Sequence, residues 1–174
     1  MGKAESRPLG FRTTEAVAVF SGTVSGTVWL RSLGRAGTHV TATLTGLSAG
    51  DHGFHVHVLG NPLDECRAAC SHFNPFGTVH GGPQSAQHHA GDLGNITADH
   101  GGIARMDAVF PFVFLSGPLS VVGRSIIVHE DPDDLGEGGR PGSHRREESL
   151  KTGNAGKRIG CAVIGIAAEE HVFG

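Results

Sequence analysis

The chain of 174 residues has no tyrosine, a single tryptophan and no apolar run near the length of a membrane-spanning helix, which needs about 18 or more apolar residues. It therefore predicts no membrane partner. The formal net charge is −3 with neutral histidine, so the chain lacks the excess of positive charge that attracts nucleic acid. The length suffices for one domain with a sizeable hydrophobic core.

Cysteine is scarce, and the three residues are Cys66, Cys70 and Cys161. An odd number leaves at least one thiol unpaired within a monomer, and in a cytosolic protein all three are reduced by default. A zinc site built on Cys66 and Cys70 is disfavoured, since no second cysteine pair follows. A disulfide between those two residues is a less favoured alternative.

The first residues, MGKAESRPLGFRTTE, contain no apolar segment of the kind that a secretory signal requires. A cytoplasmic location is therefore the simplest expectation. Gly2 and Ser6 fit the pattern for N-myristoylation, but so short a pattern often arises by accident, and we favour a solvated tail. We predict a flexible N-terminal lead-in over residues 1–14 and a C-terminal tail over residues 169–174.

Glycine, in contrast, is abundant, with 28 residues spread without a regular period, which favours many tight turns. Between these turns, short runs rich in β-branched residues predict strands. The strands are expected at residues 15–20, 26–31, 39–47, 53–58, 92–99, 102–109, 120–129 and 158–167. No segment has a convincing helical period, so we expect an antiparallel all-β sandwich or barrel without helices.

Two long segments, residues 60–91 and 130–157, have no regular apolar pattern. A structureless loop of about thirty residues is rare inside a compact domain unless something fixes it in place. Metal ligands can do so, and the first of these segments is rich in them.

Half of the 12 histidines lie in the segment that begins at Gly53 and ends at Asp92. Imidazole is the commonest metal-binding side chain at neutral pH, and a core cannot bury six imidazoles cheaply because each has two polar nitrogens. His55 and His57 are two residues apart on a predicted strand, so both project from the same face. The residues that alternate with them are apolar and point into the core.

Further candidate ligands come from distant parts of the chain. His129 ends a later strand and can approach His55 and His57 in a sandwich. The first long loop and its end supply three histidines and a carboxylate: His72, His80, His89 and Asp92. Such a set is the closed tetrahedral arrangement that zinc prefers at structural sites. The sequence therefore predicts a protein that binds more than one metal ion.

Six motifs follow one another along the chain: GFHVH, HFNP, HGGP, HHAGDLGN, IVHEDPDDLGEGG and KTGNAGKRIGCAVIGIA. Their order and spacing resemble those of the copper/zinc superoxide dismutases over residues 15–168. The resemblance implies one all-β domain, an eight-stranded antiparallel Greek-key sandwich or flattened barrel with two long loops, the zinc loop and the electrostatic loop. It also implies copper and zinc as cofactors.

The resemblance assigns ligands residue by residue. The implied copper ligands are His55, His57, His72 and His129. The implied zinc ligands are His72, His80, His89 and Asp92, with His72 bridging both metals. Asp133 would hydrogen-bond His55 and His80 and orient their rings. Cys66 and Cys161 would form a disulfide, which is unusual for a cytosolic protein.

The implied activity is dismutation of superoxide to dioxygen and hydrogen peroxide by alternating reduction and reoxidation of copper, while zinc is structural. His72 would carry a proton, and Arg158 would hold the anionic substrate with a permanently charged donor. Glu147, Glu148 and Lys151 match the charged residues of the family's electrostatic loop, which steer the substrate.

The implied partners are superoxide, a second copy of the chain and a copper chaperone. The stretches that match the family's dimer interface are residues 59–60, 122–123 and 163–166. The alternatives are a copper-chaperone-like protein and an inactive metal-binding protein of the same fold. The chain has no additional CxxC domain, and every copper ligand and the channel arginine are present, so the enzyme is favoured. A copper-only secreted relative would lack the zinc residues and the second long loop, and this chain has both.

Some residues match no ligand position. Six histidines are interpreted as surface or turn residues: His39, His52, His88, His100, His144 and His171. Cys70 is interpreted as a free, small apolar residue. The segment 140–146, which contains Arg140, Arg145 and Arg146, makes the electrostatic loop longer than the family's. We favour a solvated insertion without effect over a role in attracting the anion.

Overall fold

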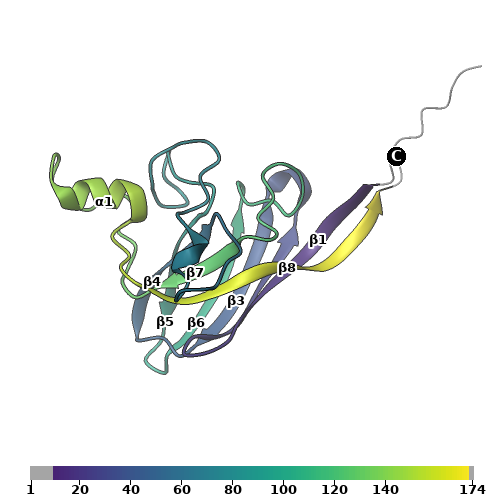
Figure 1. Cartoon of the computed structure of the whole chain (residues 1–174), viewed down its shortest axis with the longest axis horizontal. Helices are drawn as coiled ribbons and strands as arrows, with labels where there is room; N and C mark the ends of the chain where they lie inside the picture. Colours follow the sequence, from purple (N-terminus) through teal and green to yellow (C-terminus); the bar gives the residue numbers. More distant parts are fainter. Residues whose placement is uncertain (1–9, 173–174) are drawn as a thin grey trace, which may run out of the picture.

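The structure is a computed structural model that describes residues 10–172, so the Gly2 and Ser6 pattern lies outside the described residues. Over this range the fold is all-β with one α-helix (Figure 1). The strands are β1 (Gly10–Phe20), β2 (Ser25–Ser32), β3 (Thr38–Thr45), β4 (Gly50–His57), β5 (Asp92–Ala98), β6 (Ile103–Phe110), β7 (Ser125–His129) and β8 (Arg158–Val172). The helices are α1 (His144–Thr152) and the 3-10 turns η1 (Gly34–Ala36) and η2 (Arg67–Ala69).

The strands form a closed antiparallel barrel in the order β1-β2-β3-β6-β5-β4-β7-β8. Because β3 pairs with β6 and β4 pairs with β7, the connections from β3 to β4 and from β6 to β7 join strands that are not neighbours, as in a Greek key. The predicted fold class is confirmed. Each predicted strand is present, although the bounds differ at the ends.

The largest differences lie at the two ends of the domain. β1 and β8 pair from Gly10 opposite Val172 to Ala18 opposite Ile164, and they run together away from the barrel (Figure 1). The predicted lead-in and tail therefore fall partly within paired strands.

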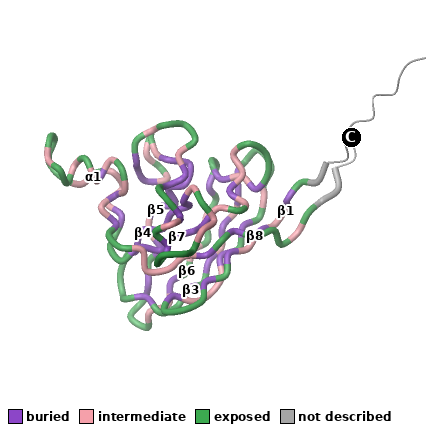
Figure 2. The backbone as a smooth tube through the Cα atoms, in the orientation of Figure 1, coloured by how far each residue is buried: buried purple, intermediate pink, exposed green. Residues whose placement is uncertain are grey.

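The barrel interior is filled by apolar side chains that alternate with outward-facing residues. Leu30, Leu44, Phe54, Ile126 and Ile164 are at most 1% exposed, and burial of each such side chain contributes about 1.5–3 kcal/mol. Figure 2 shows buried segments along the barrel strands and more exposed ones in the outer loops. The described residues contain no helix that is long and apolar enough to cross a membrane.

The helix α1 was not expected from the sequence, and that prediction is wrong. Its N-cap is Ser143, whose hydroxyl accepts a hydrogen bond from the backbone nitrogen of Arg146 at 3.2 Å, and it ends at Gly153 in the left-handed conformation. Ser149 is the only buried residue of α1. A helix without an apolar stripe has no periodic signal, which is why apolar spacing does not reveal it.

A disulfide joins Cys66 to Cys161 across a sequence separation of 95, with 5.9 Å between their Cα atoms. The expected disulfide is therefore present. Cys66 packs with Ala69 and Ile127 in a small cluster separate from the main core. The bond attaches the loop between β4 and β5 to β8. Cys70 is free, as predicted, but its side chain is exposed.

Candidate metal centre

Two imidazoles project from the outer face of β4. His55 and His57 are at most 1% exposed, and they alternate with Phe54 and Val56, which are buried in the main core. The preceding residue, Gly53, makes this arrangement possible. A Cβ atom at that position would lie 2.7 Å from Cβ of Ala155 and 3.1 Å from Cε1 of His55.

His72 from the long loop and His129 from the end of β7 complete a four-histidine group. One ring nitrogen from each of His55, His57, His72 and His129 lies within 4.8 Å of the others. Three of these buried rings have a nitrogen without a hydrogen-bond partner: Nδ1 of His55, Nε2 of His57 and Nε2 of His129. Buried polar atoms without partners are rare in folded proteins, and several in one place fit a shared metal ion.

The opposite nitrogen of each ring is held by the protein. Nε2 of His55 is 2.8 Å from Asp133 Oδ2, and Nδ1 of His57 is 2.8 Å from the carbonyl oxygen of Cys70. Nδ1 of His129 is 3.2 Å from the carbonyl oxygen of Gly156. These contacts fix the ring orientations, as outer partners of metal-binding histidines do.

A second group surrounds the carboxylate of Asp92. The Nδ1 atoms of His72, His80 and His89 lie 2.9, 3.0 and 3.2 Å from its oxygens. Nδ1 of His80 and Nδ1 of His89 are buried without a hydrogen-bond partner. Three imidazoles and one carboxylate are the donor set that suits a closed tetrahedral zinc site.

His72 lies between the two groups. Its ring centroid is 4.1 Å from that of His55 and 4.9 Å from that of His57 on one side. On the other side, the centroids of His80 and His89 are 5.3 and 5.5 Å away. Because Nδ1 faces Asp92, Nε2 is the nitrogen left for the four-histidine group.

The buried carboxylate of Asp133 connects the groups from behind. Its Oδ2 pairs with His55, and its Oδ1 lies 2.8 Å from Nε2 of His80. Asn95 fixes Asp133 in turn, through one hydrogen bond to its carbonyl and one from its amide. Asn95 was not predicted as a functional residue, and its only signal in the sequence is its place at the end of the DLGN motif that begins with Asp92.

Burial and neighbouring charge separate the histidines into two electrostatic types. Burial lowers the pKa of His129 to about 4 and holds the pKa values of His55 and His57 well below their usual range. These rings are neutral and can donate lone pairs to a metal. Burial also opposes the charged form of His80, but the hydrogen bond that its Nε2 donates to Asp133 and the negative charge of the nearby Asp92 raise its pKa to about 9. Despite its burial, Asp92 has a pKa well below its usual range because three histidines surround it.

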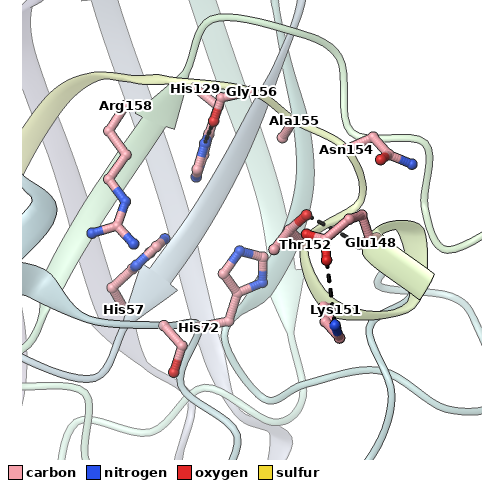
Figure 3. A pocket seen from close by; sticks show the side chains of 11 residues that line it. His57, His72, His129, Glu148, Lys151, Thr152, Asn154, Ala155, Gly156 and Arg158 are labelled. Carbon is pink, nitrogen blue, oxygen red and sulfur yellow. Dashed lines mark hydrogen bonds and ion pairs between the residues drawn. The ribbon is translucent and has the colours of Figure 1, made fainter. Parts of the chain in front are cut away.

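A cavity of about 530 Å³ opens onto the four-histidine group and contains Arg158 (Figure 3). The Arg158 guanidinium donates to the carbonyl oxygens of Cys66 at 2.7 Å, Arg67 at 3.0 Å and Cys70. Cys70 has a φ of 67°, in the left-handed region that favours glycine. Its carbonyl oxygen accepts hydrogen bonds from both Nδ1 of His57 and the guanidinium of Arg158.

Charged residues of α1 line the other side of the cavity. Glu148 and Lys151 form an ion pair at 3.3 Å there, whereas Glu147 is exposed and does not line the cavity. Arg140 and Arg145 are exposed and also lie outside the lining.

One histidine was misassigned. His52 was expected at the surface or in a turn, but it is 2% exposed on β4. Its burial follows from the local register, since β4 is buried on both faces from His52 onward. Among the other unassigned histidines, His39 pairs with Asp107 at 2.7 Å, and the ring of His88 contacts Phe112 with centroids 5.2 Å apart.

A closed antiparallel barrel with two adjacent buried groups of potential metal ligands, both of which contain His72, is typical of a binuclear metalloprotein. The model of the copper/zinc superoxide dismutase family matches residues 24–164. The chain belongs to this family.

Two copper/zinc superoxide dismutases are similar in sequence over most of the chain. The copper/zinc superoxide dismutase of Paramecium bursaria Chlorella virus 1 is 49% identical over 160 residues, which cover 91% of this chain and 81% of the relative. The extracellular copper/zinc superoxide dismutase of Onchocerca volvulus is 48% identical over 156 residues, covering 88% and 76%. The crystal structure of the clock protein EA4 superposes with a TM-score of 0.84 at 40% identity, covering 92% of this chain and 100% of that chain.

The protein is therefore an oxidoreductase that dismutes superoxide and uses copper and zinc. Two superoxide anions and two protons give one dioxygen and one hydrogen peroxide. No observation favours the alternative of a copper-chaperone-like or inactive protein.

Proposed function

We propose that the four-histidine group binds the catalytic copper and that the group around Asp92 binds the structural zinc. The copper ligands are then His55, His57, His72 and His129, and the zinc ligands are His72, His80, His89 and Asp92. The buried nitrogens without partners carry this assignment. Each would cost about 1–3 kcal/mol if left unsatisfied, and two metal ions would satisfy all of them.

His55 competes with His89 for the second site, since nitrogens of His55, His72 and His80 lie within 4.8 Å of one another and of a carboxylate oxygen of Asp92. We assign His89 to zinc because Nε2 of His55 is already held by Asp133, and its remaining nitrogen belongs with His57 and His129. Nδ1 of His89 has no hydrogen bond and lies 3.2 Å from Asp92.

Copper supplies the one-electron couple that dismutation requires, which zinc does not have. Nε2 of His72 would take up a proton only while it is not bound to copper and would then deliver it toward the product, because its Nδ1 is committed to the side of Asp92. Its pKa is lowered, chiefly by burial, so the ring resists carrying a positive charge. The Arg158 guanidinium holds the anionic substrate beside His57, oriented by the three carbonyl oxygens that it contacts.

The ligand assignment is tested with the purified protein and its His129→Ala variant. Metal content and superoxide-dismuting activity are measured for both. We expect His129→Ala to lose copper and almost all activity while it retains zinc. His100→Ala, at an exposed turn, is the matched control and should retain both metals. Full activity of the His129→Ala protein would refute the copper ligand set.

We also propose a homodimer built on residues 59–60, 122–123 and 163–166. Leu59, Val163 and Ile166 are 48%, 39% and 54% exposed. A Cβ atom on Gly60 would lie 2.1 Å from the carbonyl oxygen of Gly123 and 3.2 Å from Cγ1 of Val163. The stretches are therefore neighbours and form a continuous surface with exposed apolar groups.

Sedimentation of the full chain tests the dimer. The double change Val163→Glu and Ile166→Glu should give a monomer that keeps its fold by circular dichroism. Val19→Glu, at a 62% exposed position of β1, should leave the dimer intact. A monomeric unmodified protein at micromolar concentration would contradict the proposal.

We propose a cytoplasmic location and loading by a copper chaperone. The exposed thiol of Cys70 persists most readily in a reducing compartment. Three of the four copper-ligand nitrogens, those of His55, His57 and His129, are buried, which favours delivery by a partner protein before the loops close. Fractionation of cells that express the full chain checks the location, since recovery only outside the cells would contradict it. Copper content with and without a co-expressed chaperone checks the delivery.

A further inference from the structure

His52 is the only buried histidine of the described residues that lies outside the two ligand sets. Both of its ring nitrogens face oxygen atoms. Nδ1 lies 2.8 Å from the carbonyl oxygen of His129. Nε2 lies 3.0 Å from the carbonyl oxygen of Ser48 and 3.2 Å from the Ser48 hydroxyl. The ring therefore connects the turn before β4 to the last residue of β7.

The backbone around β7 explains why His129 needs this contact. The pairing of β4 with β7 runs only from His57 opposite Ser125 to Phe54 opposite Val128. Beyond it, the backbone nitrogen of Gly53 donates to the carbonyl oxygen of Asp131 at 3.0 Å. The carbonyl of His129 thus gets no hydrogen bond from the β4 ladder, and a buried carbonyl needs a donor. The His52 ring provides one.

His129 is consequently held at two points. His52 binds its carbonyl oxygen, and the carbonyl of Gly156 lies 3.2 Å from its Nδ1. The remaining ring nitrogen, Nε2, is buried without a partner. Glycine at position 53 makes room for the neighbouring loop, because a Cβ atom there would lie only 2.7 Å from Cβ of Ala155, next to Gly156.

We propose that His52 is a positioning residue for the copper ligand His129. It holds the backbone of His129 so that Nε2 faces the other three histidines of the copper group. This inference rests on the proposed function, in which His129 binds copper. His52 touches neither the substrate cavity nor a zinc ligand among the contacts described, so its effect should be confined to copper.

The experiment compares copper and zinc affinities, by chelator competition, in the full chain carrying His52→Leu or His52→Gln. His52→Leu removes both hydrogen bonds, and we expect copper to bind about 10-fold more weakly to the zinc-loaded protein. Zinc affinity should change by less than about twofold, since no zinc ligand is displaced. The visible absorption band of the copper-loaded protein should shift. His52→Gln, which retains an amide donor, should lie between His52→Leu and the unmodified protein.

Val40→Ala controls for a general loss of stability. Val40 is fully buried on β3, which β6 and β5 separate from β4 around the barrel. This variant should lower the melting temperature without changing copper affinity or the absorption band. The proposal is overturned if both His52 variants bind copper as the unmodified protein does. It is also overturned if they lose copper and zinc equally.

His129→Ala separates this inference from the function on which it rests. If His129→Ala keeps its copper, the ligand assignment itself fails. If His129→Ala loses copper while both His52 variants bind it normally, only the positioning role of His52 fails.

Discussion

Asn95 and Asp133 hold each other through two hydrogen bonds. The Asn95 amide nitrogen donates to the Asp133 carbonyl oxygen at 2.9 Å, and Asn95 Oδ1 accepts from the Asp133 backbone nitrogen at 2.7 Å. The carboxylate of Asp133 contacts His55 and His80, one from each ligand group. A single side-chain amide on β5 therefore fixes the carboxylate that both groups share.

We predict that Asn95→Asp weakens copper and zinc binding together. The change is nearly isosteric, but it removes the amide donor and places a carboxylate oxygen against the Asp133 carbonyl. Loss of this buried pair should cost about 1–3 kcal/mol of stability and about 10-fold in each metal affinity. Chemical denaturation and metal competition measure the two effects. Asn61→Asp, which keeps the Oδ1 acceptor used by Leu63, is the control. A loss of one metal only would contradict the shared role.

We predict that Cys161→Ser destabilises the metal-free protein by about 2–5 kcal/mol, because the disulfide closes a long loop. The Arg158 guanidinium donates to carbonyl oxygens of the same segment, so activity of the metal-loaded protein should fall as well. Cys70→Ser, at the free exposed thiol, should change stability by less than about 0.5 kcal/mol. Urea unfolding of both variants provides the comparison, and equal stabilities would refute the prediction.

We predict that the metal-free protein is most stable near pH 6.5. The pKa of His129 is lowered to about 4 by burial, so the unfolded chain gains its proton first, and stability falls as the pH drops from 6.5 toward 4. The hydrogen bond to Asp133 and the negative charge of Asp92 outweigh burial and raise the pKa of His80 to about 9. Its contribution is complete below pH 6.5 and disappears as the pH rises through 9.

Thermal unfolding of the metal-free protein between pH 4 and pH 9.5 measures both the acid limb, where stability falls toward pH 4, and the alkaline limb, where it falls toward pH 9. His80→Asn should remove the decline above pH 6.5 and leave the acid limb. A stability that keeps rising through pH 9 in the unmodified protein would show that His80 is not held in its charged form.

We predict that the inserted arginines contribute little to substrate attraction. Arg140 and Arg145 are exposed and do not line the cavity, whereas Lys151 does. Replacing Arg140 and Arg145 with Ser should change the second-order rate constant by less than about twofold at physiological ionic strength, where charges farther than about 8 Å are screened. Lys151→Ser should lower it more. Pulse radiolysis measures both, and a greater loss in the arginine variant would support the opposite interpretation.

The sequence predicts those features of the fold and the site that depend on a local repeat or on the order of motifs. It does not predict the role of a residue whose contact partner is distant in the chain. His55 and His57 are predictable because a strand places alternate residues on one face. His52 is three residues earlier on the same strand, yet its role depends on the carbonyl of His129, and no local pattern encodes that contact. The helix α1 is delimited by a cap at each end, Ser143 and Gly153. Its exposed faces need no apolar period, so spacing cannot reveal it.

The disulfide between Cys66 and Cys161 turns part of the chain into a covalent ring. Under the proposed assignment, every zinc ligand lies inside this ring. His55 and His57 precede it, whereas His72 and His129 belong to it. Copper would therefore connect the ring to the segment before it, whereas zinc would connect residues within the ring. Copper loss and disulfide reduction would release different connections, so the two events should loosen the molecule in different places.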